Sequence, residues 1–566
     1  MSGATTLDAA RARLADGDLA GALAAIDGVL RERADNAPAL ALRARLLRLR
    51  GDLEGAAACA ARALEADEAN PEALLESAAL AREQRDFERA LDLLSELVFH
   101  HPGDARAQLE IGRLHRLQNR LDEALESLRG AVASDPGLAD AHIEIGCILN
   151  LRNDHEGAMA AFERGLELDP SSVLAQHNLG YVLGKLEHYE RALELLEKLC
   201  ARVPIRQAGT WLNLALALAA HGETRRAGEI YDRILEVEPN HVTARWNRAH
   251  FLLAERDFER GWRDYEWRFL SESLGPPRLI PFAPWRGEPL EGRTLLVSAE
   301  QGLGDQIMFA SCIDELAARA GRVVLECTTR LEALFRRSFP GVQVIGSRQE
   351  LEPAWLREVG EVDYHAAAGS LPRYLRNRIE DFPRHAGYLE ADPERVRYWK
   401  SRLDALGSGL KVGLSWRGGT HSTRRRLRTL RLDDLRGLVA TPGCRFVNLQ
   451  YDDCAEELAA FRAGTGLEVA HWPEAIRDYD ETAALCSALD LTVSVCTSVI
   501  HLNGALGRPV WIMVPSAPEW RYGFRGEDLP WYPSARLFRQ AERGSWEPVV
   551  EAVTASLRAR VRESVS

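Results

Sequence analysis

The carboxylate of Asp305 follows a glycine-rich turn at the end of a short apolar run. Residues 294–299 are long enough for a buried strand and too short for a helix, and apolar residues at helical spacing begin at Ile307. A strand, a turn and a helix would place Asp305 at the carboxyl edge of a parallel sheet, where α/β folds bind ligands. Gly302 and Gly304 would let a ligand approach the backbone. Asp305, where we expect the helix to begin, is therefore either a ligand-facing carboxylate or only the cap of that helix.

Residues 415–431 carry a second set of side chains with a defined chemistry. An apolar run ends there in a Gly-Gly turn, which is followed by Arg424, Arg425, Arg426, Arg428 and Arg431. Guanidinium groups suit phosphate, because they are permanently charged and can donate two parallel hydrogen bonds. The segment is therefore a candidate phosphate site, with a solvated basic loop as the alternative.

A third group lies in residues 495–506, where an apolar run leads into a helix that we expect to start near Ser498. Thr497 and His501 would then lie in its first turn. Hydroxyls, a histidine and free backbone N–H groups at a helix start suit an anion, and a structural histidine is the alternative. Downstream, the aromatic residues of 518–533 are expected to form either a packed loop or a lid.

Length and composition limit the kind of protein that carries these groups. The chain has 566 residues, a net charge of −13, 46% hydrophobic residues and 27% charged residues. These values fit two or three ordinary globular domains and argue against a general nucleic-acid binder. Nine cysteines without a CxxC pair indicate neither a disulfide framework nor a zinc site. We expect no metal, no signal peptide and no membrane span, and hence a cytoplasmic protein.

Residues 1–270 repeat with a period of 34 residues. One series of small residues, with a single step of 35, consists of Ala22, Ala56, Ala90, Ala124, Ala158, Ala192, Ala227 and Gly261. A second series lies 12 residues earlier in each unit, from Ala10 to Ala249. Small residues at these positions would let paired helices touch. The pattern resembles the tetratricopeptide repeat and implies an α-superhelix with a concave groove.

Three amides occupy the same position in successive repeats: Asn178, Asn213 and Asn247. We expect this position to face the groove, where an amide can both donate to and accept from an extended peptide. The arrangement resembles the asparagine ladder of the eukaryotic protein O-GlcNAc transferases and implies a bound protein acceptor, with solvated asparagines as the alternative. Earlier repeats carry acidic residues there, which would prefer a basic or polar partner: Glu76, Glu110 and Glu144.

Residues 271–293 are rich in proline and glycine and are expected to form a connector. Beyond them, apolar runs alternate with helical patterns, which predicts parallel sheets covered by helices. The expected strands are residues 294–299, 322–328, 342–346, 411–416, 445–450, 491–497 and 510–514. Their number favours two Rossmann-like halves, 294–400 and 410–566. The predicted fold class is thus an α-superhelix followed by an α/β domain.

Four segments of this region resemble GT-B glycosyltransferases related to the bacterial heptosyltransferases. They are EQGLGDQIMFA at 300–310, the 415–431 loop, VCTSVIHLNGALGRPVWIMVP at 495–515 and WYPSARLFRQ at 531–540. Joined to tetratricopeptide repeats, such a domain is similar to bacterial protein glycosyltransferases, including some that modify flagellin. The resemblance implies a nucleotide-sugar donor, no metal or other cofactor, and Asp305 as the base. It implies donor contacts by Gln301, Gly302, Gly304, Arg417, Arg428, Thr429, Cys496, Thr497, Ser498 and His501.

Cys496 departs from that family, which has an aspartate before this threonine. A neutral thiol would relieve repulsion if the donor sugar brought its own carboxylate, as a CMP-linked nonulosonic acid such as pseudaminic acid does. We therefore expect a protein glycosyltransferase that moves a sugar, such an acid among the candidates, to Ser or Thr hydroxyls of a protein such as flagellin. Two other functions stay open: transfer to a glycan or lipopolysaccharide, and a non-catalytic tetratricopeptide adaptor or chaperone.

Overall fold

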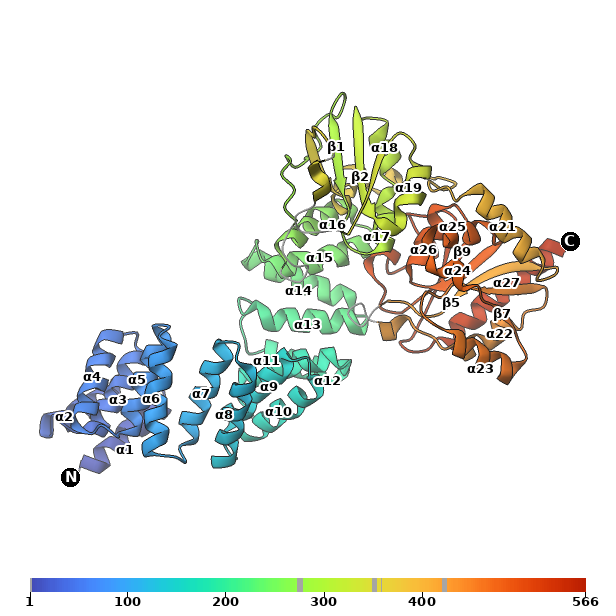
Figure 1. Ribbon diagram of the computed structural model, residues 1–566. Coiled ribbons are helices and arrows are strands. Elements are labelled where there is room, and N and C mark those ends of the chain that lie inside the picture. The colour runs from blue at the N-terminus through green and yellow to red at the C-terminus, as the bar shows by residue number, and fades with distance from the viewer. Residues whose placement is uncertain (1–2, 272–277, 349–353, 358, 420–424, 566) are drawn as a thin grey trace. The chain divides into compact units, whose positions relative to one another are not determined.

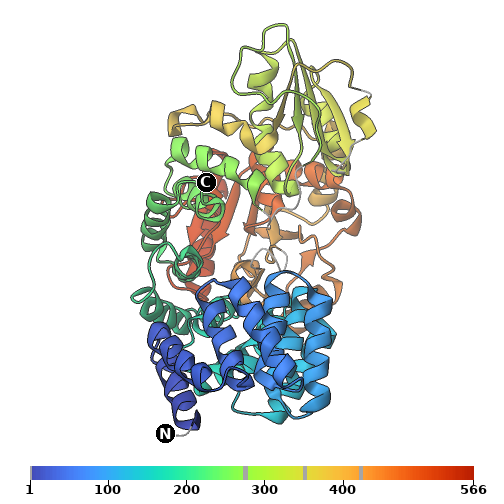
Figure 2. The same cartoon turned by 90° about the vertical axis from the view of Figure 1, so that its left-hand side faces the viewer.

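The computed structural model describes residues 3–271, 278–348, 354–357, 359–419 and 425–565. The chain forms two compact units, Met1–Ala217 and Leu218–Ser566. The first unit consists of helices, and the second combines helices with two parallel sheets (Figure 1; Figure 2). The boundary falls inside helix α13, so the last part of the predicted repeat region belongs to the second unit.

Pairs of consecutive helices build the first unit, two for each predicted repeat (Figure 1). The bounds are α1 (Gly3–Ala15), α2 (Leu19–Glu32), α3 (Ala37–Leu49), α4 (Leu53–Ala66), α5 (Pro71–Glu83), α6 (Phe87–His100), α7 (Ala105–Leu117), α8 (Leu121–Ser134), α9 (Ala139–Leu151), α10 (His155–Leu168), α11 (Val173–Lys185), α12 (Tyr189–Cys200) and α13 (Ala208–His221). Many begin at an Asp or Asn side chain that accepts a backbone N–H, as Asp18 and Asn36 do. These caps fix where the helices start.

Small residues let the helices of a pair approach, as the sequence predicts. A Cβ atom added at Gly112 would lie 2.6 Å from Leu128, and one added at Gly180 would lie 2.5 Å from Leu196. Close-packed atoms do not come this near, so a larger side chain would force the two helices apart.

The second unit begins with helices that continue the repeats. They are α14 (Thr224–Val237), α15 (Val242–Ala254), α16 (Phe258–Tyr265) and the short 3-10 helix η1 (Glu266–Leu270). Trp262 of α16 is buried and donates its indole N–H to the carbonyl of Arg376 at 2.9 Å. Its ring also meets Phe309 and Trp531 edge to face. The last repeat and the α/β region therefore share one hydrophobic core.

The first sheet has the strand order β3-β2-β1-β4, and all neighbours are parallel. Its strands are β1 (Thr294–Ser298), β2 (Arg322–Thr328), β3 (Gln343–Ser347) and β4 (Tyr364–Ala367), with helices α17 (Leu303–Ala310), α18 (Ile313–Ala317), α19 (Glu332–Ser338) and α20 (Pro372–Leu375) between and after them. Three of the strands lie where the sequence predicts them. Strand β4 is too short for its pattern to mark it in the sequence.

The second sheet has the order β10-β9-β8-β5-β6-β7, and its neighbours are also parallel. Its strands are β5 (Leu410–Ser415), β6 (Cys444–Asn448), β7 (Val469–Ala470), β8 (Leu491–Val495), β9 (Val510–Val514) and β10 (Ala535–Arg539). The sequence predicts four of these strands and misses β7 and β10. The accompanying helices are α21 (Pro393–Asp404), α22 (Arg436–Val439), α23 (Ala455–Thr465), α24 (Pro473–Arg477), α25 (Tyr479–Ala488), α26 (Ser498–Ala505) and α27 (Glu547–Val565).

Both faces of the second sheet are covered by helices, as expected for parallel strands. In β9, Ile512 belongs to the core that also holds α25 and α26. The next residue, Met513, points to the other face and belongs to the core with α22 and α27. The residues available to a ligand are therefore those at the strand ends. Among the described residues, no helix is both long enough and apolar enough to cross a membrane.

Candidate functional site

Helix α17 begins at Leu303, with Gly302 as its cap residue, which is two residues earlier than the sequence suggested. Asp305 is therefore its third residue, and its two carboxylate oxygens have different partners. Oδ2 accepts the N–H of Gly302 at 3.3 Å, so the side chain does contribute to capping. Oδ1 accepts hydrogen bonds from Arg521, from Nε at 2.7 Å and also from Nη2. One oxygen stabilises the helix start, and the other belongs to a buried ion pair.

Burial and charge act in opposite directions on this pair. The side chains of Asp305 and Arg521 are only 15% and 13% exposed. Burial raises the pKa of Asp305 above that of an ordinary aspartate, and Arg521 limits the rise. For Arg521, burial acts to lower the pKa, but the charges of Asp305 and Glu519 outweigh it and raise the pKa. Asp305 is thus a carboxyl group with a raised pKa at the carboxyl edge of β1.

Arg521 and Glu519 are the residues of this site that sequence reasoning missed. They lie beyond β9, in and just before the 3-10 helix η10 (Trp520–Tyr522). Glu519 approaches Arg428 Nη1 with Oε1 at 2.8 Å, and Arg521 Nη1 with Oε2 at 3.5 Å. The sequence signal was available, because charged residues soon after a buried strand reach the carboxyl edge of a parallel sheet. The many aromatic residues of 518–533 concealed it.

His501 lies against the glycine turn of the first sheet. A Cβ atom at Gly304 would be 2.8 Å from His501 Cδ2, so only glycine fits there without displacing the ring. The ring is 5% exposed, and its Nδ1 lies 3.0 Å from the hydroxyl of Tyr532. Burial, with a smaller effect of Arg521, lowers the pKa of His501 to about 3. At neutral pH it is therefore an uncharged hydrogen-bonding group.

The turn between β8 and α26 supplies the other predicted residues of this edge. Helix α26 starts at Ser498 as predicted, and Thr497 is its cap residue, with its hydroxyl 3.3 Å from that of Ser494. The Cys496 thiol is buried against the carbonyl of Met513, 3.8 Å away, and burial raises its pKa to about 12. Its own carbonyl accepts a hydrogen bond from Arg428 Nη1 at 3.4 Å. The thiol is therefore neutral and inside the core.

The predicted arginine loop packs directly on this turn. A Cβ atom at Gly418 would lie 2.6 Å from the carbonyl of Cys496, which requires glycine there. Arg417 is paired with Glu457, and Arg425 is paired with Asp452 at 2.6 Å. Thr429 donates to the carbonyl of Arg425 at 2.8 Å. Of the remaining predicted arginines, Arg426 and Arg431 are exposed, and Arg424 lies outside the described residues. Arg428 is the arginine of this loop that contacts Cys496 and Glu519.

Gln301 connects the site to the last repeat. It has a left-handed backbone, with φ at 60°, which is uncommon for a residue other than glycine. Its amide donates to the hydroxyl of Tyr265 at 2.7 Å, at the end of α16. Tyr265 in turn packs against Trp246 of α15, with ring centroids 5.1 Å apart. The loop that precedes α17 and Asp305 is therefore supported by the helical part of the second unit.

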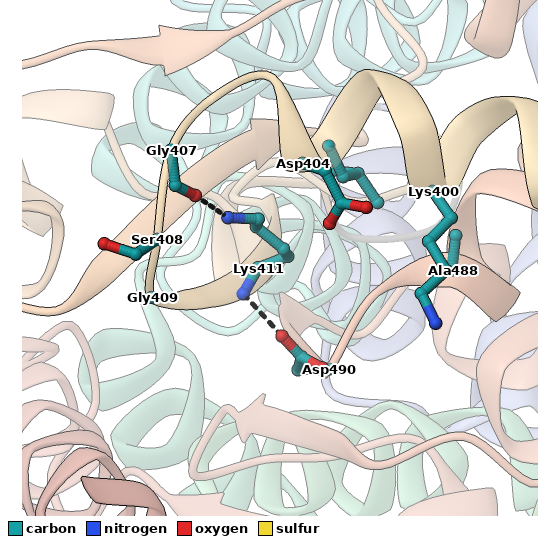
Figure 3. A pocket seen from close by; sticks show the side chains of 9 residues that line it. Lys400, Asp404, Gly407, Ser408, Gly409, Lys411, Ala488 and Asp490 are labelled. Carbon is teal, nitrogen blue, oxygen red and sulfur yellow. Dashed lines mark hydrogen bonds between the residues drawn. The ribbon is translucent and has the colours of Figure 1, made fainter.

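A hollow of about 300 Å³ lies elsewhere, before the start of β5 (Figure 3). Lys400, Asp404 and Lys411 contribute to its walls. The backbone N–H of Lys411 donates to Asp490 at 2.8 Å, and its ammonium group is bonded to the carbonyl of Gly407. This hollow lies at the strand end opposite to that of Thr497, and none of the predicted site residues lines it. In the described part of the chain, no group of three or more His, Cys, Asp and Glu side chains could hold a metal ion.

The predicted asparagine ladder divides between the units. In the first unit, Asn178 donates to the carbonyl of Leu174 at 3.0 Å, within its own helix. Asn213 donates to the carbonyl of His177 in the preceding repeat at 3.4 Å. Asn247 lies in the second unit and is half-buried. These two amides of the first unit thus donate to carbonyls of the chain itself.

The equivalent glutamates of the earlier repeats are already paired within the chain. Each binds an arginine from the preceding repeat: Arg48 with Glu76 at 2.8 Å, Arg82 with Glu110 at 2.9 Å, and Arg116 with Glu144 at 2.9 Å. Because each carboxylate is already paired with an arginine, we expect it to attract a basic partner only weakly. One repeat further on, both members of the pair change to amides, Asn150 and Asn178. The series of Arg–Glu ion pairs between neighbouring repeats therefore ends at the repeat in which the asparagines begin.

Family models match the helical region of the chain. A tetratricopeptide repeat model matches residues 7–71, 75–139, 177–236 and 212–261, and a second tetratricopeptide model matches residues 139–172. Among curated proteins, protein FlbA of Caulobacter vibrioides is 37% identical over 326 residues. That match covers 55% of this chain and 54% of FlbA, so the chain spans about half the length of this relative.

Two solved structures with detectable similarity are PilF of Pseudomonas aeruginosa and YrrB, a tetratricopeptide repeat protein with an unusual peptide-binding site. PilF is 19% identical with a TM-score of 0.36, over 38% of this chain and 99% of PilF. YrrB is 20% identical with a TM-score of 0.29, over 33% of this chain and 95% of YrrB. From the family models and the paired helices, this chain carries tetratricopeptide repeats through its N-terminal region, followed by a region with parallel sheets.

Proposed function

We propose that this chain is a protein glycosyltransferase, which moves a sugar from a nucleotide donor to a Ser or Thr hydroxyl of a protein held by the repeats. The observation that carries the proposal is the position of Asp305 at the edge of the first sheet, linked through Arg521 and Glu519 to Arg428 of the second. A carboxylate on one sheet and arginines on the other suit a GT-B enzyme. Such an enzyme needs a base and a phosphate site rather than a metal.

In the proposed reaction, the acceptor hydroxyl loses its proton to Asp305 as its oxygen bonds to the anomeric carbon. The bond between that carbon and the donor phosphate breaks, and the nucleotide leaves with the electron pair. Oδ2 is the oxygen suited to take the proton, because its contact with Gly302 is long, at 3.3 Å, whereas Oδ1 is held by Arg521. Arg428 and the start of α26, with Thr497 and Ser498, would bind the departing phosphate.

The donor would be an acidic sugar if Cys496 replaces a carboxylate for an electrostatic reason. The thiol is neutral and buried, and the nearby Glu519 already contributes a negative charge. A second protein carboxylate at this position would repel the acid group of a nonulosonic sugar such as pseudaminic acid. CMP is the nucleotide that we propose for such a donor.

The protein acceptor would bind along the repeats and is proposed to be flagellin. Support comes from the amides of Asn178 and Asn213, which have no charged partner among the contacts described. An amide can bind a peptide backbone of any sequence, so the repeats would hold an extended segment of the acceptor.

Incubation of the full chain and purified flagellin with a panel of UDP-, GDP-, TDP- and CMP-linked sugars tests the proposal. We expect one donor to be consumed, with release of its nucleotide and a gain of one or more sugar masses on the flagellin. Consumption of a donor with a glycan acceptor, but not with any protein, would instead support a glycan transferase.

A non-catalytic adaptor is the second candidate, and one observation favours it. Both oxygens of Asp305 have structural partners, Gly302 and Arg521, so the residue could be retained for stability alone. In that case Asp305→Asn would alter stability, and no nucleotide sugar would be consumed under any condition of the panel.

A further inference from the structure

Glu519 lies across two arginines that come from distant parts of the second unit. Its Oε1 is 2.8 Å from Arg428 Nη1, and its Oε2 is 3.5 Å from Arg521 Nη1. The side chains of Arg428 and Arg521 are 10% and 13% exposed, whereas Glu519 is 36% exposed. A single carboxylate on the more open side therefore bridges two largely buried guanidinium groups.

The charges of this cluster balance in the protein alone. Arg428 and Arg521 supply two positive charges, and Asp305 and Glu519 supply two negative charges. Buried ions are costly without partners, and these four described side chains together carry no net positive charge for a further anion. Asp305 is largely buried and its Oδ1 is held by Arg521, whereas Glu519 lies on the more open side. The carboxylate that can give way to an incoming anion is thus that of Glu519.

Two other described arginines near this edge, Arg417 and Arg539, already have partners within the protein. Arg417 is paired with Glu457 and lies 3.8 Å from Asp452. Arg539 donates to the carbonyls of Tyr522 and Gly523, at 2.5 and 2.9 Å, and thereby supports the loop beyond η10. An anion that enters at the carboxyl edge of β8 and β9 would therefore meet Arg428 and Arg521.

We propose that Arg428 and Arg521 form a binding site for an anionic group of the substrate, and that Glu519 occupies this site when no ligand is bound. The inference rests on the proposed function, because a nucleotide-sugar donor would bring the anion. A carboxylate or a phosphate can span two guanidinium groups, so the group is either the acid of a sugar or a phosphate of the nucleotide. The Arg521 guanidinium would then hold this anion on one side and Asp305 on the other. That contact fixes the donor relative to the base.

Titration calorimetry of the full chain with UDP, CMP and N-acetylneuraminic acid tests the site. The first two probes carry phosphate, and the third carries a sugar carboxylate without phosphate. Glu519→Gln removes the internal charge and keeps the side-chain shape. Glu527→Gln is the matched control, because it removes an equal charge from an exposed residue of the same segment, which is paired with Arg536 at 2.9 Å.

In Glu519→Gln we expect the Kd of at least one probe to fall about tenfold, which corresponds to about 1.4 kcal/mol, with no such change in Glu527→Gln. Tighter binding of N-acetylneuraminic acid alone identifies a sugar carboxylate as the ligand group, and tighter binding of UDP or CMP identifies a phosphate. Adding Arg428→Ala to Glu519→Gln should remove the gain. Thermal unfolding of each variant verifies folding, and Glu519→Ala replaces Glu519→Gln if the latter does not fold.

Unchanged or weaker binding of all three probes by the folded Glu519 variants would overturn the inference. This result is separable from the proposed function. Probe binding that improves in Glu519→Gln, in a protein that transfers no sugar, contradicts glycosyl transfer alone. Sugar transfer by a chain whose donor KM is the same with and without Glu519 contradicts the anion site alone.

Discussion

Arg521 donates from Nε to Oδ1 of Asp305 at 2.7 Å, although 216 residues separate the two in the sequence. The contact joins the helix that follows β1 of the first sheet to the segment that follows β9 of the second. Both strand ends are carboxyl ends, where parallel sheets present their ligand-binding loops. The ion pair thus brings the two sheet edges together at the residue proposed as the base.

Replacing Arg521 with Ala should leave the Asp305 charge buried without its partner. We expect the free energy of unfolding of the second unit to fall by roughly 3–5 kcal/mol, the range for breaking a buried pair by removing one partner. Urea unfolding followed by tryptophan fluorescence measures the loss, and the exposed Arg536→Ala is the control. Arg521→Ala combined with Asp305→Asn should recover part of the stability. An Arg521→Ala chain as stable as the parent would show that the pair has no structural role.

Acidification should destabilise the second unit through His501. Its pKa in the folded chain is about 3, below the value of about 6.5 for an exposed histidine, so only the unfolded chain takes up this proton between these pH values. Stability is therefore complete above pH ~6.5 and falls by about 1.4 kcal/mol per pH unit below it. Unfolding free energies at pH 7.5 and 5.5 measure the loss, and His501→Gln should make it smaller. Equal losses in the two proteins would exclude His501 as a source.

The three asparagines should matter for the partner and not for the donor. Replacing Asn178, Asn213 and Asn247 together by Ala removes their amide hydrogen bonds, and we expect about tenfold weaker binding of purified flagellin with unchanged nucleotide binding. Gln207→Ala, which removes an exposed amide in the turn before α13, is the control. Undiminished flagellin binding by the triple variant would contradict the ladder hypothesis.

The periodic features of the chain were predictable from sequence, whereas the surroundings of Asp305 were not. The 34-residue period and the apolar runs gave the repeats and most strands, since both patterns are local. The same period relates Arg48, Arg82 and Arg116, so the pairing of arginines with glutamates could have been found by extending it. The place of Arg521 beyond β9 could also have been found, but its pairing with Asp305 could not, because no local pattern relates residues 216 positions apart.

Cys496 tests whether the donor is acidic. Cys496→Asp would place a carboxylate in the core beside Glu519, so we expect lower transfer from an acidic donor by about tenfold or more. Cys496→Ser keeps a small neutral side chain and should be tolerated. Initial rates with the donor identified in the panel measure both effects, with thermal unfolding as the control for stability. Improved turnover in Cys496→Asp, or a neutral sugar as the true donor, would refute the electrostatic explanation.

The most direct test of the central claim is the intact mass of flagellin from a strain that lacks this protein, complemented with the parent chain or with Asp305→Asn. The substitution keeps the side-chain shape and its cap contact but removes the proposed base, so transfer should fall by about 10²-fold or more. We predict sugar-bearing flagellin with the parent chain and unmodified flagellin with the variant, at equal protein levels. Full modification by Asp305→Asn, or none by the parent, would contradict the account.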